Sequence, residues 1–341
     1  MRIRVLIIDD SPTMRAILMA QLAHEPDIAV VGTAANAAEG RELIKRCNPD
    51  VITLDIEMPG MNGLGLLDKI MRLRPMPVIV VSGSTQQGSA MTARALALGA
   101  VDCYAKADRS EGQGHADTGK LAALIRDAAQ VRFTNRLPAA RPLAAPPPAQ
   151  LTTHARLIAI GSSTGGVEAL QVLLRAFPEN CPPTIVVQHI DARFAPAVAK
   201  MLDTVCPARV VLADPGQRAK PGHVYLAPGD DRHMTIGGNA DLSIGLRQGT
   251  EVSGHVPSVD VLFQSVVKAV GGDAIGILLS GMGSDGAKGL LAMAQAGAHT
   301  IAQDEASCAV FGMPRMAIAL GAAGVVAPID CIARHVFQEA A

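Results

Sequence analysis

Residues 157–166 read LIAIGSSTGG, and the helix-like pattern VEALQVLLR follows from Val167. An apolar run of strand length therefore leads through a glycine-rich turn into a helix. Strand, turn and helix in this order form the repeating unit of a parallel α/β sheet. Glycine permits a strained turn after the strand, and the start of a helix favours negative charge beside it. The segment predicts an α/β sheet that presents a small polar side chain at its edge.

The same alternation of strand-like and helix-like segments recurs on both sides of a central, proline-rich region. We predict an α/β fold class with two doubly wound parallel-sheet domains. Helices of the second domain are predicted after Gly166 and at 195–202, 259–270 and 287–294. The predicted strands are Val5–Ile8, Ala29–Gly32, Val51–Leu54, Val78–Val81 and Val101–Tyr104 in the first domain, and Leu157–Ile160, Thr184–Val187, Val210–Leu212, Val224–Leu226 and Ala274–Leu279 in the second.

The first helix of the chain has clear start signals. Ser11 can cap its N-terminus, and Pro12 occupies its first position, where a missing N–H costs nothing. We expect one apolar stripe to face the sheet. Its members are Met14, Ile17, Leu18 and Leu22.

Residues 137–150 read LPAARPLAAPPPAQ, and no Asp or Glu occurs between Ala128 and Val167. Proline at this density excludes helix and sheet and favours an extended spacer. A proline-rich surface loop within one domain is the alternative. We predict a first domain at residues 3–125, a linker at 126–152 and a second domain at 153–341.

The composition excludes several classes of protein. The net charge is −1 and the chain has no Trp, two Tyr and six Phe, so we expect no nucleic-acid partner. Its six cysteines are scattered, which argues against a zinc site or a disulfide framework. No stretch reaches the roughly 18 apolar residues that span a bilayer. We therefore expect a cytoplasmic protein that is not a membrane protein.

Acidic side chains gather at the predicted strand ends of the first domain. Asp9 and Asp10 end the first strand, Asp55 ends the third, Ser82 ends the fourth, and Lys106 follows the fifth. Carboxyl ends of parallel strands converge on one crevice, where three carboxylates need a cation such as Mg²⁺. A carboxylate beside that metal can attack a phosphoryl group, and Lys106 and Ser82 can contact the phosphate oxygens. Taken singly, each Asp can instead be a helix cap or a turn residue.

These segments resemble a response-regulator receiver domain over about residues 3–125. The resemblance rests on Ile7–Ser11, Leu54–Gly63 and Val80–Ser82. It implies a flavodoxin-like fold that uses Mg²⁺ for phosphorylation, and a chemotaxis histidine kinase as phosphodonor. Ala107 departs from the pattern, because receivers usually have Pro there. The implied roles are phosphoacceptor for Asp55, metal ligands for Asp9, Asp10 and Asp55, and phospho-switch for Ser82, Tyr104 and Lys106.

The turn Gly161-x-Ser163-x-Gly165 fits both a nucleophile elbow and a phosphate-binding turn, and the residues alone leave both open. The absence of a following Lys excludes a Walker-type loop. A nucleophilic serine needs a base and an orienting acid. His189 follows the strand Thr184–Gln188, and Asp285 follows the strand Ile275–Leu279. All three side chains can meet at one sheet edge. His233 and His255 are rival bases, but we place both among turn residues.

The chain order Ser, His, Asp disfavours an α/β-hydrolase. The second half instead resembles the catalytic domain of chemotaxis protein-glutamate methylesterases, which have a Rossmann-like fold, over about residues 153–335. The resemblance implies Ser163 as nucleophile, His189 as base and Asp285 as its partner, with Thr164 beside the nucleophile and the Met282 amide in the oxyanion hole. Ser284 stands where the family commonly has Ala. The supporting runs are Gly161–Gly166, Gln188–His189, Pro221–Gly229, Pro257–Asp260, Gly281–Gly286 and Phe311–Pro314.

Together the resemblances imply a phosphorylation-activated serine hydrolase. It would demethylate glutamate methyl esters on the cytoplasmic domains of methyl-accepting chemotaxis receptors and deamidate receptor glutamines. No cofactor is expected for the hydrolase reaction. The receiver is expected to restrain the hydrolase until Asp55 is phosphorylated. The competing class is a phospho-regulated binding protein whose second domain has lost catalysis.

Overall fold

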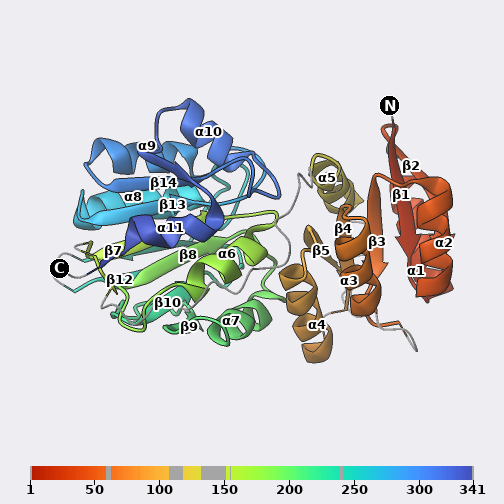
Figure 1. The fold of residues 1–341 in the computed structure, drawn as a ribbon, viewed down its shortest axis with the longest axis horizontal. Coiled ribbons are helices and arrows are strands. Elements are labelled where there is room, and N and C mark those ends of the chain that lie inside the picture. The colour runs from red at the N-terminus through yellow and green to blue at the C-terminus, as the bar shows by residue number, and fades with distance from the viewer. Residues whose placement is uncertain are drawn as a thin grey trace. The chain divides into compact units, whose positions relative to one another are not determined.

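The computed structural model describes residues 2–58, 63–83, 85–106, 118–131, 151–153, 155–238 and 241–339. The chain divides into two compact units, residues 1–133 and 134–341, each built around its own sheet (Figure 1). Most of the predicted linker and Ala107 lie outside the described residues. The last helix of the first unit ends at Ala128, three residues beyond the boundary predicted at 125.

The first unit contains a five-stranded parallel sheet of order β2-β1-β3-β4-β5. This is the flavodoxin-like order, as predicted, and it reverses between β1 and β3, where such folds bind ligands. The strands are β1 (Ile3–Ile8), β2 (Ile28–Ala34), β3 (Val51–Asp55), β4 (Val78–Ser82) and β5 (Asp102–Ala105). The helices are α1 (Pro12–Leu22), α2 (Ala37–Cys47), α3 (Gly63–Leu73), α4 (Gln86–Ala97) and α5 (Thr118–Ala128).

Helix α1 begins as the sequence predicts. The Ser11 hydroxyl accepts a hydrogen bond from the Met14 amide, and Pro12 is the first helical residue. The predicted apolar stripe is wrong at Ile17, which is 44% exposed, whereas Leu18 and Leu22 are buried. Residues four apart share a helix face, so the stripe that reaches the core is narrower than the four apolar positions suggest.

The second unit contains a seven-stranded parallel sheet of order β15-β14-β13-β7-β8-β10-β9, in keeping with the predicted doubly wound class. It includes two strands that the sequence reading missed, β14 and β15. The former mixes polar and apolar residues, and the latter is only three residues long. The strands are β7 (Leu157–Ser162), β8 (Thr184–Gln188), β9 (Arg209–Leu212), β10 (His223–Leu226), β13 (Ala274–Leu278), β14 (His299–Gln303) and β15 (Val325–Ala327).

Helices cover this sheet in two groups (Figure 1). In one group α6 packs against α7 and α11, and in the other α9 packs against α8 and α10. The helices are α6 (Gly166–Arg175), α7 (Ala195–Asp203), α8 (Val259–Val270), α9 (Ala287–Gln295), α10 (Met313–Ala319) and α11 (Ile329–Val336). Two antiparallel pairs complete the unit: β11 (Arg232–Gly237) with β12 (Ser243–Gln248), and β6 (Leu151–Thr152) with β16 (Gln338–Glu339).

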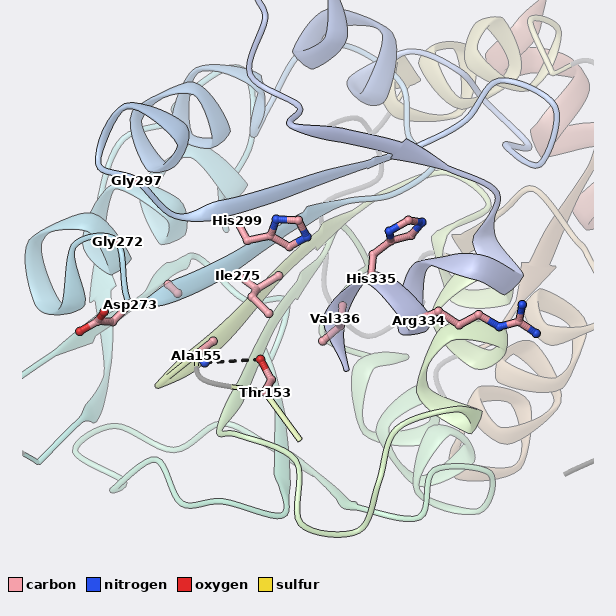
Figure 2. A pocket seen from close by; sticks show the side chains of 11 residues that line it. Thr153, Ala155, Gly272, Asp273, Ile275, Gly297, His299, Arg334, His335 and Val336 are labelled. Atoms are coloured by element: carbon pink, nitrogen blue, oxygen red, sulfur yellow. Dashed lines mark hydrogen bonds between the residues drawn. The ribbon is translucent and has the colours of Figure 1, made fainter. Parts of the chain in front are cut away.

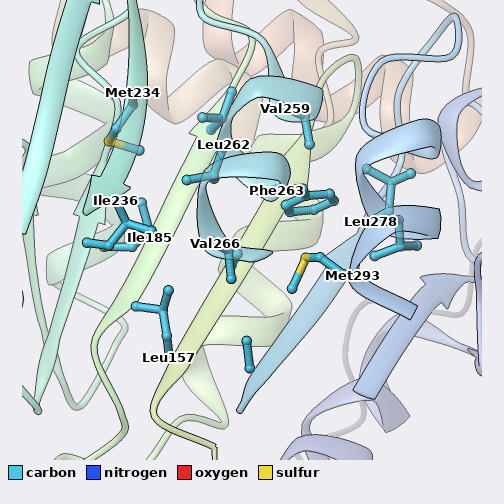
Figure 3. Close-up of a cluster of buried hydrophobic side chains, with 14 of the residues drawn as sticks. Leu157, Ile185, Met234, Ile236, Val259, Leu262, Phe263, Val266, Leu278 and Met293 are labelled. Atoms are coloured by element: carbon cyan, nitrogen blue, oxygen red, sulfur yellow. The ribbon is translucent and has the colours of Figure 1, made fainter. Parts of the chain in front are cut away.

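The core of the second unit forms where α8 packs against β7, β11 and α9 (Figure 3). Phe263 and Val266 of α8 are fully buried there, and burial of such side chains stabilises the fold by about 1.5–3 kcal/mol each. The start of α8 touches the end of β7, since a Cβ at Gly161 would lie 2.2 Å from Val259 Cγ1. This contact fixes how far the start of α8 lies from the turn that follows β7. None of the described helices is long and apolar enough to cross a membrane.

Candidate functional sites

Ser163 lies on the tight turn between β7 and α6 and is 9% exposed. Its amide donates to the Ser280 carbonyl at 3.0 Å, which ties the turn to the end of β13. Gly165 completes the turn with φ +74°, and a Cβ there would lie 2.4 Å from the Cβ of Ala309. Only glycine meets both constraints without strain. The local fold thus holds Ser163 at the carboxyl edge of the sheet, where the sequence predicts it.

His189 directly follows β8, and its Nε2 lies 2.9 Å from Asp285 Oδ2. Its amide donates to the Ser162 carbonyl, which places His189 beside the turn that carries Ser163. The other ring nitrogen, Nδ1, is buried and has no hydrogen-bond partner among the described residues. A ring nitrogen that is hydrogen-bonded to a carboxylate carries the N–H proton of the neutral imidazole. In neutral His189, Nδ1 is therefore the basic nitrogen. Within the described part of the chain, the structure records no hydrogen bond from Ser163 Oγ to this ring, and such contacts are commonly loose without substrate.

Asp285 is fully buried and accepts four hydrogen bonds. Besides His189 Nε2, the donors are the Ser258 hydroxyl and the amides of Val259 and Asp260. The two amides belong to the first turn of α8, whose positive end favours a carboxylate. Although burial raises the pKa of Asp285, hydrogen bonds from His189 and the Asp260 amide lower it more strongly, so the net pKa is lowered. The carboxylate is therefore ionised beside His189.

His255 stacks on His189 with ring centroids 3.8 Å apart and an interplanar angle of 15°. Burial, followed by the positive charge of His189, lowers the pKa of His255 to about 4. A neutral imidazole therefore covers one face of the His189 ring at pH 7. This stacking could not be predicted from the sequence, because His255 lies in an irregular segment 66 residues beyond its partner.

The prediction that His233 lies among turn residues is wrong, since it lies within β11 and is 6% exposed. Its Nε2 is 2.9 Å from the Thr250 carbonyl, and its Nδ1 accepts from the Ser258 amide at 3.1 Å. Both ring nitrogens are thus occupied, and the side chain fixes the residue that precedes α8. His233 is a structural histidine and not a rival base.

Met282, whose amide is the predicted donor of the oxyanion hole, lies in the loop between β13 and α9. The Gly281 carbonyl accepts from the amides of Gly312 and Met313, which anchors the loop after β13. In the described part of the chain, no hydrogen bond is recorded from the next amide, that of Met282. Thr164 is 5% exposed, and its carbonyl accepts from the Ser280 hydroxyl. Ser284 is exposed.

The first unit brings Asp9, Asp10 and Asp55 together as predicted, with one carboxylate oxygen of each within 4.8 Å of the others. Lys106 Nζ lies 2.6 Å from Asp55 Oδ2 and 3.1 Å from Asp9 Oδ2. Three carboxylates face one ammonium group, which leaves a net negative charge. Asp10 remains partly open to solvent. Because Mg²⁺ binds few carboxylates and keeps several waters, the donor set fits that ion.

Burial and charge act in opposite directions on this acidic cluster. Burial lowers the pKa of Lys106. Its hydrogen bond to Asp55 and the charges of Asp55 and Asp9 together raise the pKa by more than burial lowers it, so the net pKa is raised. The pKa of Asp9 is raised because burial and the charge of Asp55 outweigh the attraction of Lys106. Ser82 is fully buried at the end of β4, where its carbonyl accepts from the Lys106 amide. Tyr104 is buried on β5, beside this edge.

Figure 2 shows a cavity of about 440 Å³ in the second unit. Ser163 follows the carboxyl end of β7, so it lies at the other end of the sheet from this cavity. His299 begins β14 and Ala274 begins β13, so the cavity opens at the amino ends of these strands. His335 and Arg334 of α11 line its other side, and Figure 2 shows the Arg334 side chain directed away from the other labelled groups. No member of the predicted catalytic set lines it.

Comparison with known proteins identifies both units. Residues 158–336 match the family model of the CheB methylesterase, and residues 5–112 match the response regulator receiver domain. The protein-glutamate methylesterase/protein-glutamine glutaminase 1 of Caulobacter vibrioides is 51% identical over 321 residues, 94% of this chain and 93% of that protein. The protein-glutamate methylesterase/protein-glutamine glutaminase of Rhizobium etli is 48% identical over 337 residues, 98% of this chain and 96% of that protein.

The solved structures agree with the curated relatives. The crystal structure of the Thermotoga maritima CheB methylesterase catalytic domain matches with a TM-score of 0.52 and 33% identity, covering 54% of this chain and 98% of that one. Both resemblances drawn from the sequence are therefore confirmed. At these identities and coverages, the chain belongs to the CheB family of protein-glutamate methylesterases and protein-glutamine glutaminases, with a response-regulator receiver domain as its first unit.

Proposed function

We propose that this enzyme hydrolyses glutamyl methyl esters on methyl-accepting chemotaxis receptors, and deamidates receptor glutamines, with Ser163 as its nucleophile. The observation that carries the proposal is the state of His189. One ring nitrogen is hydrogen-bonded to a buried carboxylate at 2.9 Å, and the other is buried with no partner among the described residues. Such a ring is oriented and in the correct tautomer to accept the proton of a serine hydroxyl.

In the acylation step, Ser163 Oγ attacks the ester carbonyl while its proton passes to Nδ1 of His189. The negative charge that develops on the carbonyl oxygen is stabilised by the Met282 amide, and one such donor contributes about 2.7–4 kcal/mol. Asp285 stabilises the imidazolium that forms. Collapse of the tetrahedral intermediate breaks the bond to the methoxy oxygen, which receives from His189 the proton that came from Ser163 and leaves as methanol.

In the deacylation step, a water molecule attacks the acyl-serine ester and gives its proton to Nδ1 of His189. The acyl–oxygen bond then breaks, the proton returns to Ser163 Oγ, and the receptor keeps a free glutamate carboxylate. A primary amide follows the same path with ammonia as the leaving group. None of these steps needs a metal ion or an organic cofactor.

We further propose that phosphorylation of Asp55 raises the rate of this hydrolysis. A chemotaxis histidine kinase is the proposed phosphodonor, and Asp9, Asp10 and Asp55 would hold Mg²⁺. When bound, the ion neutralises charge on the incoming phosphoryl group. Lys106, already 2.6 Å from Asp55, would pair with the phosphate oxygens, while Ser82 and Tyr104 relay the change. The phosphoryl group would bias a two-state receiver that restrains the hydrolase.

Mapping the reactive serine tests the chemistry. A serine-directed fluorophosphonate should label the protein on the peptide that contains Ser163, and His189→Gln should slow labelling by at least about 10³-fold. Labelling of another serine at the wild-type rate would contradict the assignment.

Deletion of residues 1–128 tests whether the receiver restrains the hydrolase. Methanol release by the shortened chain should exceed that of the unphosphorylated full-length chain. An equal or lower rate would exclude the restraint.

A further inference from the structure

Gln188, the last residue of β8, links the nucleophile turn to the residue that bears the base. It is 2% exposed. Its Nε2 donates to the Ser163 carbonyl at 2.8 Å and to the His189 carbonyl at 3.0 Å. Its Oε1 accepts from the Ser162 hydroxyl at 2.7 Å. One neutral side chain therefore contacts the backbone of both residues that exchange a proton in the proposed mechanism.

The turn is shaped around this amide. A Cβ at Gly166 would lie 2.2 Å from Gln188 Oε1, so the backbone approaches the amide more closely than any side chain allows. The Ser162 hydroxyl donates to Oε1 of Gln188. A rotation of the side-chain amide that exchanged Oε1 and Nε2 would therefore leave buried polar groups unpaired. The Ser163 carbonyl is held from a second direction by the Gly166 amide at 2.7 Å.

The chemistry of the side chain matches this task. Both carbonyl oxygens need donors, and a glutamine amide offers two N–H groups together with one acceptor. Glutamate of the same shape has no donor when ionised, and methionine of similar volume has none at all. Few other side chains can bridge two carbonyls and one hydroxyl without adding charge beside His189.

We propose that Gln188 is a positioning residue that sets the distance between Ser163 Oγ and the imidazole of His189. This inference rests on the proposed roles of Ser163 and His189. The His189 amide still donates to the Ser162 carbonyl when the bridge is lost, but the Ser163 carbonyl loses its link to β8. The turn can then shift relative to His189, and a displacement of about 1 Å at reacting atoms can cost on the order of 10²-fold in rate. Gln188 touches neither substrate nor reacting atoms, so its loss should lower kcat and leave KM nearly unchanged.

The test uses Gln188→Met in the full-length chain, with methanol release from methylated receptor membranes as the assay. We expect kcat to fall about 10–100-fold, with KM within about threefold of wild type. Thr300→Val is the matched control for the loss of a buried hydrogen bond. Thr300 is 2% exposed on β14 of the same sheet, and its hydroxyl accepts from the Gly324 amide at 3.0 Å. This control should lower the unfolding midpoint but keep kcat within about twofold.

A folded Gln188→Met enzyme with wild-type kcat, or one whose loss lies only in KM, would overturn the inference. If that variant does not fold, Ser162→Ala removes the hydroxyl that orients the amide, and its kcat should fall several-fold at unchanged KM; a wild-type kcat would count against the proposal. Ser163→Ala is assayed in parallel. Methanol release that survives Ser163→Ala refutes the proposed function, whereas an inactive Ser163→Ala beside a wild-type Gln188→Met refutes only the positioning role.

Discussion

Asp285 Oδ2 lies 2.9 Å from Nε2 of His189, so the hydrogen bond that orients the ring uses this nitrogen and leaves Nδ1 without a partner among the described residues. The same carboxylate accepts hydrogen bonds from two backbone amides in the first turn of α8. The orientation of His189 therefore depends on the position of a helix start, which is itself fixed by the packing of Val259 against Gly161.

Replacing the orienting acid tests this dependence. Asp285→Asn should lower kcat by about 10⁴-fold, because the amide can no longer serve as a charged acceptor that holds the correct tautomer of His189. Methanol release measures the effect, and circular dichroism reports the folded fraction. Asp260→Asn is the control, since Asp260 is also a buried carboxylate but bonds to the Ser253 hydroxyl and the Gly289 amide. Equal losses in the two variants would contradict the role given to Asp285.

The stacked histidine predicts a pH dependence of stability. Burial and the charge of His189 lower the pKa of His255 from 6.5 to about 4. Because the folded pKa lies below the unfolded one, the stabilisation is complete above pH 6.5 and is lost as the pH falls towards 4. The free energy of unfolding should decline through this window, and His255→Phe, which keeps a stacked ring, should flatten the decline. An unchanged slope in the variant would assign the decline to other groups.

The turn after β7 predicts a position-specific cost of adding a methyl group. Gly165 and Gly216 have similar φ angles of +74° and +76°, but only a Cβ at Gly165 meets another atom, at 2.4 Å. Gly216→Ala should therefore cost about 1–2 kcal/mol of stability, for backbone strain alone. Gly165→Ala should cost more and lower kcat, because relief of the clash moves Ser163. Urea unfolding and methanol release compare the two variants, and equal stability losses would exclude the close contact with Ala309.

The receiver predicts a single acceptor for phosphate. Acetyl phosphate with Mg²⁺ should label the wild-type chain and raise its methanol release, whereas Asp55→Asn and chelation of the metal should abolish both effects. Asp68→Asn on α3 is the control, because its carboxylate is exposed and should leave labelling unchanged. Labelling that persists in Asp55→Asn would place the phosphoacceptor elsewhere.

The strand and helix pattern of the sequence predicts most of the fold because buried parallel strands are short, continuous apolar runs. The limits follow from the same rule. The sequence does not predict β14, because only Ile301 and Ala302 of its five residues are apolar. It wrongly predicts a turn at His233, because β11 belongs to a hairpin that alternates polar and apolar residues.

The sequence could bring the three proposed catalytic residues together because Ser163 and His189 directly follow strands and Asp285 lies in the loop between β13 and α9. Parallel strands end at one edge of a sheet, so residues after them can meet there. The contacts that orient these residues could not be predicted from the sequence. The Ser258 hydroxyl and the amides that bind Asp285 come from a helix start 25–27 residues earlier in the chain. No local sequence pattern predicts that this helix start packs against Asp285. Gln188 did carry a signal, since it is a polar residue at the buried end of a strand, immediately before His189.

The rate of methanol release from methylated receptor membranes by Ser163→Ala tests the central claim most directly. Ser284→Ala is the matched control, because it removes an exposed hydroxyl from the loop that carries Asp285. The serine-hydrolase account predicts that Ser163→Ala loses at least about 10³-fold in kcat while remaining folded, and that Ser284→Ala keeps wild-type activity. Methanol release by Ser163→Ala at the wild-type rate would contradict it.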